Sequence, residues 1–140
     1  MDILSPEDLL EFLNAMLEAE RAGAKALLHI ARDTKNNDIA ALAKDIHRDE
    51  ARWCAMLTTA IRDLDGDPSS RTGQFYEKVM AIAEDGARLG LVNRGQDWVV
   101  RKLREMLPKI TDPQLSRDLT EMLSSHQDNI ARVARSDLIN

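Results

Sequence analysis

The sequence predicts an all-α fold in which residues 1–140 form a single domain, an antiparallel helical bundle. Three observations predict it. Apolar residues recur at the helical period along most of the chain. Only six Gly and four Pro interrupt it, which leaves long stretches free to be helical. Aromatic residues make up 4% of the chain, so Leu, Ile, Met and Ala must fill the core, a composition that suits helices better than strands.

The first two helices are predicted at 6–33 and 39–64. Ser5 is a favourable N-cap and Pro6 fits the first helical position. The polar run 33–38 predicts a tight connection between the two helices, and Asp38 is the expected cap of the second one. Such a short connection makes the two helices an antiparallel hairpin.

The second half of the chain predicts a further hairpin with an extra or broken third helix. A turn at 65–70 precedes a helix at 73–90, the stretch Gly90–Gly95 interrupts it, and a shorter helix follows at 96–109. The sequence leaves open whether these are one broken helix or two. After a Pro-rich turn, Thr111 or Asp112 caps a last helix at 113–136.

Charge and composition exclude several classes of function. The net charge of −5 and the pI near 5.2 argue against a nucleic-acid partner. No apolar run approaches the ~20 residues of a membrane span, and the N-terminus lacks the features of a signal peptide. The single cysteine, Cys54, fits a reducing compartment and is expected to be a small core or boundary residue. We therefore expect a cytoplasmic protein without membrane or nucleic-acid partners.

Three ionisable residues lie where an apolar face should be uninterrupted. Glu20, Glu50 and His126 each fall near the centre of the apolar stripe of their predicted helix, whereas His47 lies roughly 80° off its stripe. Glu20 and Glu50 are nearly equidistant from the first turn, so an antiparallel hairpin brings them into one layer to within one helical rise of ~1.5 Å. His126 lies roughly 21 Å along its helix, also in the middle of the bundle.

The segments LNAMLEAERAG (13–23) and DIHRDEARW (45–53) resemble the first hairpin of the ferritin-like, rubrerythrin-related superfamily. That resemblance implies a four-helix bundle with a Glu on the first helix and Glu-x-x-His on the second, an arrangement repeated in the second hairpin. It also implies a di-iron centre that serves oxidation, peroxide reduction or iron storage. Glu20 and Glu50 match the two Glu positions of the first hairpin.

Several positions depart from the pattern of that superfamily. Trp53 stands three residues after Glu50 where the pattern has His, and Leu123 stands three residues before His126 where it has Glu. The region 73–109 offers no carboxylate on its apolar stripe. The resemblance therefore implies at most a mononuclear metal site, formed by Glu20, Glu50 and His126 with His47 as a possible substitute, and no two-iron turnover.

Two interpretations of these residues remain open. In the first, which we expect of the side chains, they form a metal-free buried network that shares a proton. In the second, a degenerate ferritin-like protein binds one metal ion. Oxygen and imidazole ligands suit iron, manganese and zinc alike, so the sequence does not select one of these metals. The function that we expect is nevertheless a degenerate ferritin-like protein of unknown role that retains at most a mononuclear metal site, and the alternative is a non-catalytic helical interaction module or homodimer with the metal-free network.

Overall fold

The computed structural model describes residues 3–139, and these residues confirm the all-α prediction, with no strand among them. One 3₁₀ turn, Leu107–Lys109, follows the fourth helix. The five α-helices are α1 (Pro6–Asp33), α2 (Asn37–Asp63), α3 (Phe75–Met80), α4 (Asp85–Met106) and α5 (Pro113–Arg135).

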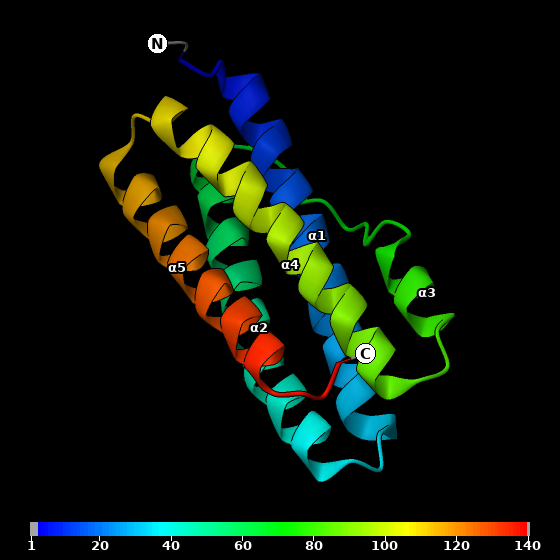
Figure 1. The fold of residues 1–140 in the computed structure, drawn as a ribbon. Coiled ribbons are helices and arrows are strands. Elements are labelled where there is room, and N and C mark those ends of the chain that lie inside the picture. The colour runs from blue at the N-terminus through cyan, green and yellow to red at the C-terminus, as the bar shows by residue number, and fades with distance from the viewer. Residues whose placement is uncertain (1–2, 140) are drawn as a thin grey trace.

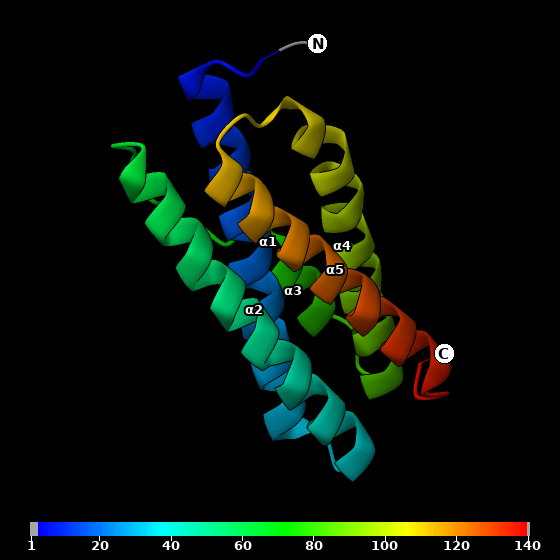
Figure 2. The same ribbon diagram turned by 90° about the vertical axis from the view of Figure 1, so that its left-hand side faces the viewer.

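Two antiparallel hairpins, α1–α2 and α4–α5, pack side by side to form a four-helix bundle (Figure 1). Residues 64–84, which include α3, cross from the end of α2 to the opposite end of the bundle, where α4 begins. As a result α2 and α4 run in the same direction, although each hairpin is antiparallel as predicted. In the view of Figure 2, α2 and α5 lie side by side in front, and α3 lies behind them.

Side-chain caps set where the long helices begin. Ser5 accepts a hydrogen bond from the Asp8 amide at 3.1 Å, as its N-cap position predicts. Asn36, and not Asp38, caps α2 by accepting from the amides of Asp38 and Ile39, so α2 begins at Asn37 rather than at residue 39. Asp112, one of the two expected candidates, caps α5.

The prediction for the third helix placed its break at the wrong residues. The break lies at residues 81–84, and α4 runs without interruption through Gly90 and Gly95. Glu84 starts α4 by accepting from the amides of Gly86 and Ala87. A Cβ at Gly95 would lie 2.7 Å from the Phe75 ring, so this glycine lets α3 pack closely on α4 rather than ending a helix.

The core is divided into two apolar clusters, one toward each end of the bundle. The first surrounds Leu13, Leu57 and Leu119, and the second surrounds Leu27, Ile46 and Val133. Cys54 is partly buried against the first cluster, which confirms its expected boundary position. Burial raises the pKa of its thiol to about 12, so this cysteine is an unreactive thiol at neutral pH.

No helix among residues 3–139 is both long enough and apolar enough to cross a membrane.

Candidate functional site

A layer of buried polar side chains separates the two apolar clusters. Each long helix contributes one residue on its inner face: Glu20 from α1, Glu50 from α2, Gln96 from α4 and His126 from α5, all at most 3% exposed. The flanking inward residues belong to the first cluster on one side and to the second on the other. The polar residues therefore form one layer across the bundle.

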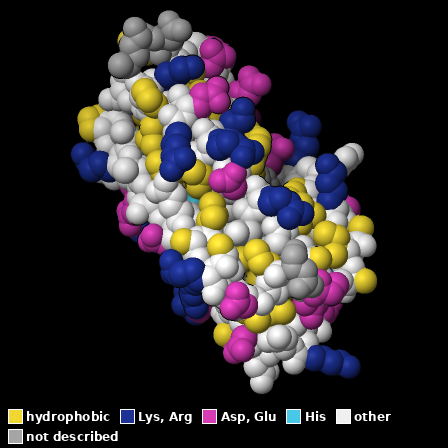
Figure 3. Space-filling view, in the orientation of Figure 1, with side chains coloured by type: hydrophobic (Ala, Val, Ile, Leu, Met, Phe, Trp, Pro, Cys, Tyr) yellow, Lys and Arg dark blue, Asp and Glu magenta, His cyan; other side chains and the backbone are white. Residues whose placement is uncertain are grey.

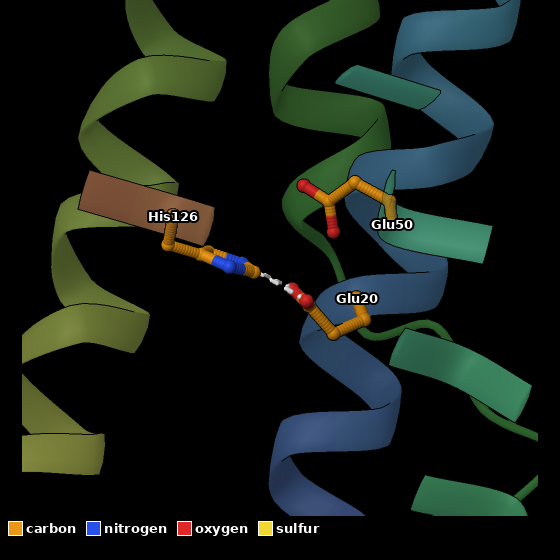
Figure 4. A group of neighbouring side chains, drawn as sticks. All are labelled: Glu20, Glu50 and His126. Atoms are coloured by element: carbon orange, nitrogen blue, oxygen red, sulfur yellow. Dashed lines mark hydrogen bonds and ion pairs between the residues drawn. The ribbon is translucent and has the colours of Figure 1, made fainter. Parts of the chain in front are cut away.

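Glu20, Glu50 and His126 converge within this layer, as their spacing predicted. The Nε2 atom of His126 lies 2.9 Å from Oε1 and 3.1 Å from Oε2 of Glu20. One potential ligand atom from each of the three residues can be chosen so that all lie within 4.8 Å of one another. Figure 4 shows the three side chains pointing toward one another from three different helices.

The backbone fixes which nitrogen of His126 carries hydrogen. The Nδ1 atom lies 3.0 Å from the carbonyl oxygen of Met122, which can only accept, so Nδ1 must donate. In the neutral ring Nε2 then presents a lone pair to the Glu20 carboxyl group. Two acceptors face each other there unless a proton or a metal cation lies between them.

Burial changes the acidity of both carboxyl groups. It raises the pKa of Glu20 from 4.5 to about 8, and a hydrogen bond with Glu50 opposes part of this rise. Burial also raises the pKa of Glu50 well above its ordinary value, and the negative charge of Glu20 adds to that effect, whereas His126 opposes it. At neutral pH Glu20 of the metal-free protein therefore retains its proton, and burial opposes ionisation of Glu50 as well.

Three polar atoms in the layer lack a hydrogen-bond partner among the described residues. They are Oε2 of Glu50, and both Oε1 and Nε2 of Gln96. Buried polar atoms are rarely left unpaired, and each costs about 1–3 kcal/mol when it is. The unpaired oxygen of Glu50 lies beside the Glu20–His126 pair and is available to a bound cation.

Gly23 makes room for the Glu50 carboxyl group. A Cβ at this position would lie 2.9 Å from Oε1 of Glu50. Gly23 follows Glu20 by one helical turn on α1, so the glycine and the acid lie on the same face. Sequence reasoning did not identify this role, because a lone glycine in a helix carries no sign of what packs against it.

His47 does not join the three converging residues. Its ring is partly buried, and Nδ1 lies 2.8 Å from the carbonyl oxygen of Ala24. Trp53 and Leu123, at positions where the superfamily has ligands, pack in or against the first apolar cluster. The arrangement thus offers one imidazole and two carboxyl groups, which is enough for one metal ion and not for two.

Gln96 is the member of the layer that the sequence prediction missed. The break expected at Gly90–Gly95 placed it at the start of a short helix, where its face was undefined. In the continuous α4 it continues the inward stripe of Leu89, Val92, Val99 and Leu103. That periodicity would have revealed it had the glycines been read as helical.

The family described as "Domain of unknown function (DUF6306)" matches residues 7–135, and the chain belongs to this family. No curated protein and no solved structure matches the chain. The matched range contains all members of the polar layer, but the family description assigns no activity. Any function must therefore be argued from the site itself.

Proposed function

We propose that this DUF6306 domain is a ferritin-like bundle that binds one divalent metal ion through Glu20, Glu50 and His126. The arrangement of its helices supports the proposal, because two antiparallel hairpins joined by one long crossover is the connectivity of ferritin-like bundles. Side chains that project inward from facing helices are the usual source of metal ligands in such folds.

The orientation of His126 is the observation that carries the proposal. Metal-binding histidines almost always donate their second ring N–H to a carboxyl group or a backbone carbonyl, which fixes the ring and the tautomer. His126 makes this bond to Met122 and directs Nε2 at a buried carboxyl group. An imidazole that is held so, with two carboxyl groups within ligand distance, is arranged to receive a cation.

The charges of the layer also fit a divalent ion. When ionised, Glu20 and Glu50 balance two positive charges, while neutral His126 and the Gln96 carboxamide add none. A buried site of zero net charge avoids the high cost of uncompensated charge in a protein interior. Iron, manganese and zinc all accept this set of oxygen and nitrogen ligands. Such an ion would supply Lewis acidity at the centre of the bundle.

The metal-free network is the second candidate, and the raised acid pKa values favour it. With both carboxyl groups protonated, Glu20 can donate to Nε2 of His126 and satisfy the lone pair without a metal. The domain would then be a structural or interaction module. The two candidates differ in one measurable respect, which is whether a metal displaces those protons.

Metal binding at equilibrium tests the proposal. The protein is treated with chelator and dialysed against Mn²⁺, Zn²⁺ or, without oxygen, Fe²⁺, and the bound metal is measured. We expect one ion per chain for wild type and an affinity at least about tenfold lower for Glu50→Gln, which keeps the shape and removes the charge. Glu11→Gln, an exposed change on α1, is the control. No binding of any of the three ions would leave the metal-free network.

Gly23→Ala is expected to weaken metal binding without unfolding the protein. The new methyl group would displace the Glu50 carboxyl group, whose flexible end can move, while Ala favours the helix by about 1 kcal/mol over Gly. Gly90→Ala is the matched control, since a Cβ there meets only ordinary contacts at 3.8 Å or more. Both variants should be at least as thermally stable as wild type, and only Gly23→Ala should lose metal affinity. Equal affinity in both would refute the role of Gly23.

A further inference from the structure

A cavity of about 360 Å³ lies beside the polar layer, between α1 and α4. Its inner end is formed in part by Glu20, Glu50 and Gln96, which are buried. Arg94 and Trp98 also line it and are exposed, so they mark the end that faces solvent. The cavity therefore leads from the surface to the residues of the candidate site.

The walls of this cavity are apolar. Phe75 from α3, Leu91, Val92 and Val99 from α4, and Ala19 from α1 form them. On the surface shown in Figure 3, hydrophobic side chains are visible over α3 and α4, interspersed with charged ones. The volume lies at the lower end of the range for small-molecule sites, which span about 300–1,000 Å³.

We propose that this cavity is a binding pocket for a small, uncharged and mainly apolar molecule, about the size of a single substituted aromatic ring. Apolar walls disfavour any ionised group, because that group would lose its hydration without gaining a partner. Arg94 at the entrance adds to this selection by disfavouring cations.

The pocket does not depend on a bound metal, so it goes beyond the proposed function and can be tested in protein treated with chelator. The probes are toluene, benzyl alcohol, benzoate and benzylammonium, which share a ring and differ in polarity and charge. Binding is followed by NMR through the methyl signals of Leu91, Val92 and Val99 and the indole signal of Trp98. We expect the two neutral probes to shift these signals to saturation, and the two charged probes to bind at least about tenfold more weakly.

Filling the pocket provides the decisive comparison. Ala19→Phe places a ring in the cavity and is expected to abolish binding of the neutral probes. Ala15→Phe, an exposed position one turn earlier on α1, is the matched control and should bind as wild type does. Leu91→Trp offers a second way to fill the cavity if Ala19→Phe does not fold.

Three results would each overturn the proposal: no saturable shift with either neutral probe, charged probes that bind as tightly as neutral ones, or undiminished binding in folded protein whose cavity has been filled. Failure of metal binding in the separate dialysis experiment would leave this result unaffected.

Discussion

Glu20→Gln is expected to stabilise the metal-free protein at pH 8, by on the order of 4 kcal/mol relative to wild type, and to make its stability less dependent on pH. The reason is that burial raises the pKa of Glu20 from 4.5 to about 8. Glutamine keeps the shape of the side chain and cannot ionise. Its amide can still donate to Nε2 of His126.

The direction of the effect follows from proton binding. Between pH 4.5 and about 8 the native protein retains the Glu20 proton and the unfolded chain does not, so unfolding releases a proton. The stability of the native state is therefore greatest below pH 4.5 with respect to this group and falls as the pH rises through about 8. Between its pKa in the unfolded chain and its pKa in the native protein, each such carboxyl group lowers the free energy of unfolding by about 1.4 kcal/mol for every unit by which the pH rises.

Glu50 titrates in the same direction, because burial and the charge of Glu20 raise its pKa. The stability of wild type should therefore fall more steeply between about pH 5 and pH 8 than that of Glu20→Gln, which lacks the titration of residue 20. Denaturant unfolding in the presence of chelator measures both slopes. Glu11→Gln controls for loss of an exposed carboxylate. Parallel stability curves for wild type and Glu20→Gln would contradict the raised pKa of Glu20.

The convergence of Glu20, Glu50 and His126 could be predicted from the sequence because it depends on local geometry. The helical period determines which face each residue occupies, and equal distances from one short turn place Glu20 and Glu50 in the same layer. The predicted face and the predicted layer of each residue stay the same when a helix end is misplaced by one or two residues. This explains why the three residues are buried together although α2 begins at Asn37 and not where it was expected.

The third helix was predicted less well because its signals depend on tertiary packing. Gly90 and Gly95 suggested a break, yet the Phe75 ring explains why Gly95 lacks a side chain inside a continuous helix. The path of residues 64–84 likewise depends on where α3 packs, which no local pattern records. Because of the same error the prediction missed Gln96, which is the member of the polar layer that comes from α4.

Gln96→Glu is expected to change the ion preference of the site from divalent to trivalent. Gln96 lies in the same buried layer as Glu20 and Glu50 and lines the same cavity. In wild type two carboxylates balance one divalent ion, whereas a trivalent ion would leave a buried positive charge. A third carboxylate reverses this balance, since it neutralises a trivalent ion and leaves an excess negative charge around a divalent one.

The quantity to measure is the ratio of the affinity for Tb³⁺ to the affinity for Zn²⁺ or Mn²⁺, with protein freed of metal beforehand. We expect this ratio to rise at least tenfold in Gln96→Glu, or about 1.4 kcal/mol. Gln127→Glu introduces the same charge at an exposed position of α5, next to His126, and should leave the ratio nearly unchanged because solvent screens it. An equal rise in both variants would attribute the effect to long-range charge. An unchanged ratio in folded Gln96→Glu would place residue 96 outside the reach of the bound ion, and its unpaired amide would then need a different partner.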